Sequence, residues 1–156
     1  MLDYVFKTHN AKETSDFGRM VAPFLVAQSV ITLSGDLGAG KTTFAGGLAQ
    51  GLGIHEKILS PTFNIMRCYF NAALPLFHID AYRLESGNKD LGLEEFIEGN
   101  GVTLIEWPQY IQKIIPSTSL NIIIKNLGDD CREIQVQTTN PAYAALFSKI
   151  REEFVW

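Results

Sequence analysis

Eight residues, Gly35 to Thr42, read GDLGAGKT and fit the pattern G-x-x-x-x-G-K-[ST] at every fixed position. Glycines in such a loop let the backbone turn successive N–H groups inward, which forms a nest for an anion. A helix that follows would add unpaired N–H donors and a partial positive charge. Lys41 is placed to reach the terminal phosphates of a nucleotide, and the Thr42 hydroxyl to ligate Mg²⁺.

The alternative for this stretch is a glycine-rich turn with a chance lysine. However, the apolar run SVITLSG precedes it and apolar residues at helical spacing follow it, which is the context that a phosphate-binding loop requires. We therefore predict a site for a nucleoside triphosphate. The residues predicted to contact the phosphates are Gly35, Asp36, Leu37, Gly38, Ala39, Gly40, Lys41, Thr42 and Thr43.

The sequence favours adenine over guanine as the base. GTPases usually read guanine with an N/T-K-x-D motif on a late loop. The nearest string here, Asn88-Lys89-Asp90-Leu91, has its aspartate one position early and lies before the last strand. We therefore expect ATP to be the nucleotide.

Two carboxylates close apolar runs and are candidates for the magnesium site and for catalysis. Asp80 ends LPLFHID and Glu106 follows GVTLI. Carboxylates at the carboxyl ends of strands in such a sheet fall on the ligand side. They are predicted to hold Mg²⁺, directly or through water, or to act on the attacking water. The alternatives are that Asp80 caps the next turn and that Glu106 is a solvated charge at a strand end.

Three other residues are candidates on less direct grounds. Thr62, in SPTF, lies at a distance from the loop suited to a switch segment that senses the γ-phosphate, although the string alone favours a turn with proline. Trp107 follows Glu106 and by itself favours a core or interface position. Arg132 follows a predicted hairpin turn, where most arginines are solvated.

The elements that must position these residues follow from hydrophobic periodicity and from turn and capping signals. We expect strands over 2–7 and 29–35, a loop leading into a strand over 60–70, a strand within 73–84 that ends near Asp80, and a strand over 101–107. An antiparallel hairpin is expected over 120–139, turning through 128–130. Helices are expected over 11–27, 42–52, 91–98, 108–115 and 141–154.

Local signals refine the helix ends. Asn10 and Asn140 are expected as N-caps, and Pro23 is expected to kink or end the first helix. Gly46 and Gly47 weaken the helix after the loop, and two explanations stay open, close packing or local motion. Strands alternate with helices until the hairpin. The fold class is therefore α/β, with a mostly parallel central sheet and an antiparallel edge hairpin, in a single domain over 1–156.

Composition sets limits on partners and location. The 156 residues are 46% hydrophobic and carry a formal net charge of −4 with a sequence pI of about 5.3, which argues against a broad electrostatic grip on nucleic acid. Cys68 and Cys131 lie far apart and are expected to be reduced thiols, and the three histidines are too scattered for a metal cluster. With no secretory signal or membrane-spanning run, we expect a cytoplasmic protein.

The strings GDLGAGKTTF, SPTF, HIDAYRL, LGLEEFI and LIEWP, in this order and spacing, closely resemble the TsaE (formerly YjeE) family. The resemblance runs from about Ala11 to Gln137. It implies a three-layer P-loop NTPase fold that binds ATP and Mg²⁺ and hydrolyses ATP slowly alone. It also implies association with TsaB and TsaD, the pair that makes threonylcarbamoyladenosine in tRNA, with tRNA contacted only indirectly. The ATP cycle would then reset the complex between turnovers.

The resemblance also assigns roles to individual residues. It implies phosphate binding by 38–43, a magnesium site at Thr42, Asp80 and Glu106, and catalytic roles for Lys41, Thr62, Asp80 and Glu106. It places the adenine end between the N-terminal segment and the late hairpin, where Ala11 and Arg132 are candidates. The role of Trp107 stays open. Ala81 stands where a larger apolar residue is common in the family, a departure that should not affect the chemistry.

Two other functions compete with the accessory ATPase. The first is a small-molecule kinase on the same fold, which usually carries an arginine-bearing lid over the phosphates. The region that would form such a lid offers only Arg67 and Arg83. The second is a nucleotide-gated binding module without meaningful turnover. The ordered set of motifs favours the ATPase over both.

Overall fold

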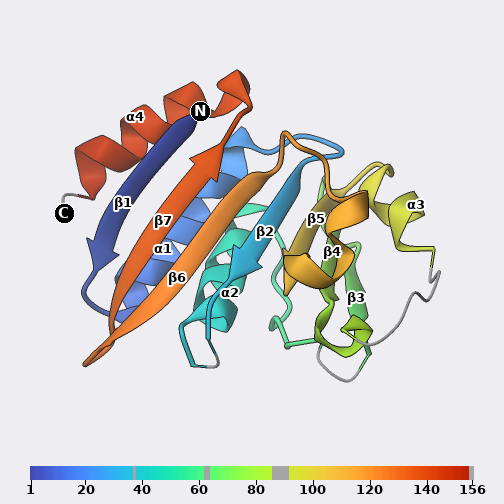
Figure 1. Cartoon of the computed structure of the whole chain (residues 1–156), viewed down its shortest axis with the longest axis horizontal. Helices are drawn as coiled ribbons and strands as arrows, with labels where there is room; N and C mark the ends of the chain where they lie inside the picture. The colour runs from blue at the N-terminus through green and yellow to red at the C-terminus, as the bar shows by residue number, and fades with distance from the viewer. Residues whose placement is uncertain (37, 62–63, 86–91, 155–156) are drawn as a thin grey trace.

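A computed structural model of the chain describes residues 1–36, 38–61, 64–85 and 92–154. Seven strands form one sheet in the order β1-β7-β6-β2-β5-β4-β3 (Figure 1). The strands are β1 (Leu2–Thr8), β2 (Val30–Ser34), β3 (Met66–Tyr69), β4 (Leu76–Asp80), β5 (Val102–Glu106), β6 (Leu120–Gly128) and β7 (Cys131–Thr138). The α-helices are α1 (Ala11–Val21), α2 (Lys41–Gly51), α3 (Leu93–Ile97) and α4 (Ala144–Glu153). The 3₁₀ helices among these residues are η1 (Ala22–Phe24), η2 (Tyr82–Leu84), η3 (Pro108–Ile114) and η4 (Pro141–Tyr143).

The α/β class is confirmed, but the sheet is mixed rather than mostly parallel. Its central pairs β6–β2, β2–β5 and β5–β4 are parallel, whereas β1–β7, β7–β6 and β4–β3 are antiparallel. The predicted hairpin forms, yet it is not the sheet edge, because β1 pairs with β7 along its whole length. This pairing buries Phe6 opposite Ile134, a contact between distant parts of the chain that local patterns do not reveal.

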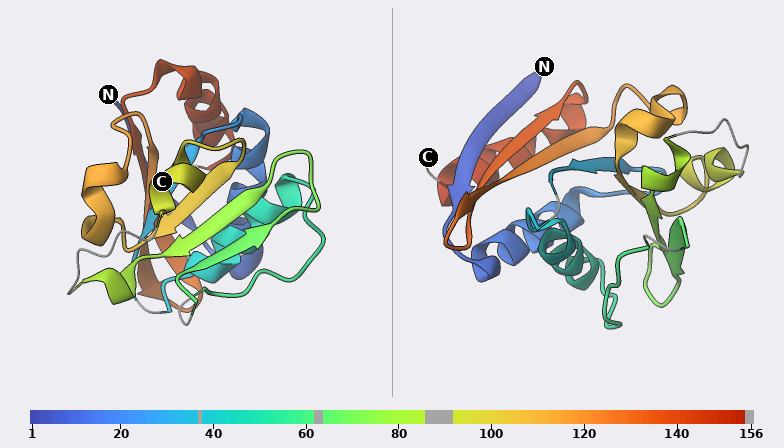
Figure 2. Two further views of the ribbon diagram at one scale, coloured as in Figure 1. Left: turned by 90° about the vertical axis from the view of Figure 1, so that its right-hand side faces the viewer. Right: turned by 60° about the horizontal axis from the view of Figure 1, so that its bottom comes forward.

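Helices pack on both faces of the sheet (Figure 2). The larger core cluster joins α1, α2 and α4 to one face, with Phe17, Phe44 and Phe147 fully buried. A smaller cluster joins η2, α3 and η3 to the other face around Ile79 and Ile105. The segment 108–115, expected to be an α-helix, forms the 3₁₀ helix η3 with a kink at Ile111. Within the described residues, no helix is both long and apolar enough to span a membrane.

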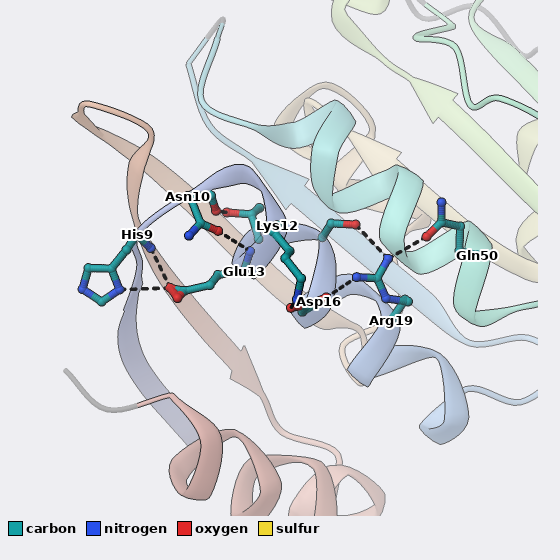
Figure 3. A network of polar contacts seen from close by, with 9 residues as sticks. His9, Asn10, Lys12, Glu13, Asp16, Arg19 and Gln50 are labelled. Atoms are coloured by element: carbon teal, nitrogen blue, oxygen red, sulfur yellow. Dashed lines mark hydrogen bonds and ion pairs between the residues drawn. The ribbon is translucent and has the colours of Figure 1, made fainter.

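The first helix begins and ends where its sequence signals predict. The Asn10 side chain accepts a hydrogen bond of 2.8 Å from the Glu13 N–H, which confirms the N-cap, and Glu13 in turn accepts one of 2.8 Å from the His9 N–H (Figure 3). Hydrogen bonds from His9, foremost the one from its N–H, lower the pKa of Glu13. Helix α1 ends at Val21, and Pro23 lies in η1. Asn140 caps η4, from which α4 continues.

Helices α1 and α2 approach each other closely through glycines. A Cβ on Gly47 would lie 2.0 Å from the Ser15 carbonyl oxygen, and one on Gly18 would lie 2.4 Å from the Phe44 carbonyl oxygen. Figure 3 shows Arg19 reaching across from α1, where it donates a hydrogen bond of 2.6 Å to the Gln50 side chain of α2. Close packing therefore accounts for Gly47. Gly46 has open space around it, so packing does not account for that residue.

This difference predicts opposite outcomes for two neighbouring substitutions. Gly47→Ala forces backbone atoms apart and should lower the free energy of unfolding by about 2 kcal/mol or more. Gly46→Ala, the matched control, meets no atom within 4 Å and should raise it by up to ~1 kcal/mol through helix propensity. Urea unfolding of both variants measures the effects. Equal effects of the two substitutions would contradict the packing argument.

Candidate nucleotide-binding site

The carboxyl ends of β2, β4 and β5 open onto a cavity of about 720 Å³. This volume lies within the roughly 300–1,000 Å³ usual for small-molecule sites. The parallel register sets Leu33 of β2 and Asp80 of β4 on either side of Glu106 of β5. The cavity is lined by Gly38, Gly40, Lys41, Thr42, Thr43, Ser60, Asp80, Tyr82, Glu106, Trp107 and Arg132. Residues predicted from separate motifs therefore meet in one place.

The glycine-rich loop runs from the end of β2 to the start of α2. Gly38 and Gly40 have φ angles of 79° and 103°, in the left-handed region that favours glycine. Because α2 begins at Lys41, its first-turn N–H groups belong to Lys41, Thr42 and Thr43. These donors, which lack helical partners, lie beside the cavity, as phosphate binding requires.

The other predicted loop residues have less direct positions. A Cβ on Gly35 would lie 2.5 Å from the Ile124 carbonyl oxygen of β6, so the loop begins in contact with the sheet. The Asp36 side chain is exposed, and its carbonyl accepts a hydrogen bond from the N–H of buried Ala39. Leu37 and Thr62 lie outside the described residues, and their proposed contacts stay predictions.

Lys41 and Glu106 form the buried charged centre of the site. Lys41 Nζ lies 3.7 Å from Glu106 Oε1 and 4.6 Å from the centroid of the Trp107 ring. Lys41 and Glu106 are each less than a tenth exposed. Glu106 is therefore not a solvated charge at a strand end, which was the alternative for this residue.

Glu106 has a second partner that the sequence did not single out. Its Oε2 lies 2.7 Å from Nε2 of His78, a histidine of β4 that is 1% exposed. The sequence did hold a signal that His78 belongs to the site. It lies two residues before Asp80, and alternate residues of a strand share a face. The scatter of the three histidines along the sequence concealed this contact.

Asp80 caps the following turn, and its position is also compatible with the role predicted for it at the magnesium site. Its Oδ1 accepts a hydrogen bond of 3.0 Å from the Tyr82 N–H, so it does cap the following turn. It is also 5% exposed and lines the cavity opposite Glu106 in the sheet register. The carboxylate is thus held at a fixed place in the cavity wall, where it can reach a metal ion or a water molecule.

Three aromatic residues cluster beside the charged centre, and two of them, Tyr82 and Trp107, line the cavity. The Trp107 ring lies 5.0 Å from Tyr82 and 6.2 Å from Tyr110, centroid to centroid. Trp107 has a φ angle of 56°, an uncommon conformation for a bulky residue, at the point where β5 turns into η3. Burial, and then the charge of Glu85, raises the pKa of Tyr110. Trp107 therefore lines the cavity and also packs, partly buried, against the smaller core cluster.

Arg132 contacts the glycine-rich loop directly. Its Nε donates a hydrogen bond of 2.7 Å to the Ala39 carbonyl, and its guanidinium also reaches the Gly38 carbonyl at 3.3 Å and Asn126 Oδ1 at 3.0 Å. Arg132 is therefore not simply solvated. These bonds tie the loop to the β6–β7 hairpin.

Ala11, the other residue predicted at the adenine end, lies near Arg132. The two line a small hollow of about 20 Å³ together with Thr14, Gly40, Thr43 and Asp130. A hollow of this size holds about one water molecule. The predicted neighbourhood is present, and adenine binding there stays a prediction.

The residues present fit a magnesium ion shared with a nucleotide. No group of three or more histidine, cysteine, aspartate or glutamate side chains in the described part of the chain could hold a metal alone. Mg²⁺ usually binds through one or two carboxylates together with substrate phosphates and water. Asp80, Glu106 and the Thr42 hydroxyl offer such a partial set around the cavity.

Comparisons with known proteins agree with the resemblance. The family described as "Threonylcarbamoyl adenosine biosynthesis protein TsaE" matches residues 8–134. This chain belongs to the TsaE family. It is 44% identical to the Bacillus subtilis (strain 168) protein TsaE over 93% of this chain and 92% of that protein. It is 41% identical to TsaE of Treponema pallidum (strain Nichols), over 83% and 96% of the two chains.

A solved structure shares the fold. The crystal structure of Bacillus subtilis YdiB superposes with a TM-score of 0.81 at 39% identity, covering 97% of this chain and 95% of that one. Membership places the chain in the biosynthesis of threonylcarbamoyladenosine in tRNA, the process named for the TsaE relatives.

The contacts of Arg132 predict that it acts on the loop rather than on the base. Arg132→Ala should weaken ATP binding at least about tenfold, because even one bond from a charged donor is worth ~1.5–3 kcal/mol. Binding of inorganic triphosphate, which has no base, should weaken by the same factor. Calorimetry with both ligands measures this, and Arg151→Ala, in α4, is the control. A loss confined to ATP would instead assign Arg132 to the adenosine part.

Proposed function

We propose that this chain is a magnesium-dependent ATPase, built as a single P-loop domain over 1–156 with a three-layer fold. We further propose that it acts in the cytoplasm as an accessory subunit of TsaB and TsaD, with tRNA contacted only through that complex. The observation that carries the proposal is the convergence of Lys41, Thr42, Asp80 and Glu106 on one cavity at the carboxyl ends of parallel strands. Family membership and the acidic pI support an accessory role in which the partners, rather than this chain, contact the tRNA.

The residues of the cavity have separable roles in this proposal. The loop and the first turn of α2 donate N–H groups to the phosphates, and Lys41 supplies positive charge at the terminal ones. Mg²⁺, held by Thr42 and the carboxylates, would supply charge that neutralises the phosphates. Glu106 and Asp80 orient the attacking water by accepting hydrogen bonds from it. Thr62 remains the proposed sensor of the γ-phosphate.

The kinase alternative gains no support from the geometry. Arg67 lies in β3 and Arg83 in η2, and neither lines the cavity. A lid over the phosphates would need such an arginine to point into the site. The ATPase is therefore the function that the described residues favour.

Lys41 gives the direct test of nucleotide binding. Lys41→Ala removes the buried cation nearest the phosphates and should weaken ATP binding at least about a hundredfold in calorimetry. Lys149→Ala, an exposed lysine in α4, should leave the affinity unchanged. Unchanged affinity in Lys41→Ala would overturn the site.

Glu106 gives the test of hydrolysis. Glu106→Gln preserves shape but removes the charge, so steady-state ATP hydrolysis should fall about a hundredfold. Binding of ATP measured without Mg²⁺ should change less than about threefold, because the phosphate contacts remain. Normal turnover in this variant would exclude Glu106 from the catalytic machinery.

A further inference from the structure

His78 is a buried histidine beside the proposed catalytic carboxylate, and none of the roles described above uses it. It belongs to β4 and is 1% exposed. Its Nε2 lies 2.7 Å from Glu106 Oε2, a distance typical of a strong hydrogen bond to a charged acceptor. No other polar contact of this side chain is present among the described residues, because Nδ1 is buried without a partner.

The geometry shows which ring nitrogen of His78 faces the Glu106 carboxylate. A carboxylate only accepts hydrogen bonds, so Nε2 of His78 must donate. Nδ1 is buried and has no hydrogen-bond partner among the described residues. A buried polar atom without a partner is destabilising, and an apolar side chain of similar size would avoid this cost. The hydrogen bond to Glu106 is the interaction that a histidine makes here and an apolar side chain would not.

The bond determines how Glu106 faces Lys41. With Oε2 engaged by His78, only Oε1 is directed toward Lys41, and the contact is long at 3.7 Å. Both charged groups are nearly buried, where attraction between opposite charges is strong. Without the bond to His78, the carboxylate could rotate and pair closely with Lys41. That pairing would compete with the phosphates for Lys41 and with Mg²⁺ for Glu106.

We propose that His78 is a positioning residue that holds the Glu106 carboxylate in the orientation needed for the MgATP site. The proposal rests on the proposed function, since it assigns Glu106 to the metal and the attacking water. His78 acts only through Glu106 and does not touch the nucleotide. Partners that orient a metal-binding side chain typically contribute ~10–100-fold to metal affinity or activity.

Two substitutions distinguish the effect of the hydrogen-bond donor from the effect of the volume of the ring. His78→Gln places an amide N–H near the position of Nε2, whereas His78→Leu fills the space without a donor. In His78→Leu, the gain in ATP affinity on adding Mg²⁺, measured by calorimetry, should fall about tenfold, and kcat should fall about as much. In His78→Gln both should stay within about threefold of the wild type. ATP affinity without Mg²⁺ should decrease in His78→Leu, because Lys41 is then held by Glu106.

The same substitutions in Glu106→Gln test the route of the effect. If His78 acts through Glu106, neither substitution changes the magnesium-dependent gain further in that background. Three results would overturn the proposal: a wild-type gain in His78→Leu, equal losses in His78→Gln and His78→Leu, or losses that add to those of Glu106→Gln. Failure of the proposed function is distinct, because the wild type would then neither bind nor hydrolyse MgATP.

A measurement on the ATP-free protein reads the ring of His78 directly and needs no activity. Nitrogen-15 NMR distinguishes protonated from unprotonated ring nitrogens, and the His78 signals are assigned by their loss in His78→Gln. The wild type should show the hydrogen on Nε2, protected from exchange with solvent, and its resonance should shift in Glu106→Gln. An Nε2 without a hydrogen, or no response to Glu106→Gln, would overturn the proposal.

Discussion

The parallel pairing of β5 with β2 on one side and β4 on the other is the constraint on which the site depends. It brings the ends of three strands to one edge of the sheet and sets Glu106 level with Leu33 and Asp80. The phosphate-binding loop leaves β2 at this same edge. A slip of one residue in β5 would turn Glu106 to the opposite face of the sheet. The apolar strand cores that prevent such a slip therefore also define the chemistry.

A second set of contacts links the phosphate-binding loop to the antiparallel half of the sheet. Arg132 of β7 holds the carbonyls of Gly38 and Ala39, and β7 is in turn paired with β1. Behind the loop, α2 is packed against α1 through Gly18 and Gly47. The loop is thus supported from the hairpin and from the helix layer. This support would preorganise the loop for the anion that we propose it binds, although the chain as a whole is acidic.

The sequence predicted the elements and most of the residues that line the cavity, because the signals were local. The loop pattern, the Asn10 cap and the carboxylates at strand ends each depend on neighbouring residues. The pairing of β1 with β7 and the bond between His78 and Glu106 depend on residues 28 or more positions apart. The kinked 3₁₀ form of η3 follows from packing of 110–115 on the sheet, which overrides helix propensity. Local patterns carry no information about such contacts.

The measurement that tests the central claim most directly is reconstitution with TsaB, TsaD, tRNA and the other substrates of the modification, scored as modified tRNA formed per transferase. The account predicts that the wild-type chain sustains several turnovers, whereas Glu106→Gln, which retains the fold and the phosphate contacts, permits about one. Equal yields with the wild type, with Glu106→Gln and with the chain omitted would contradict the account.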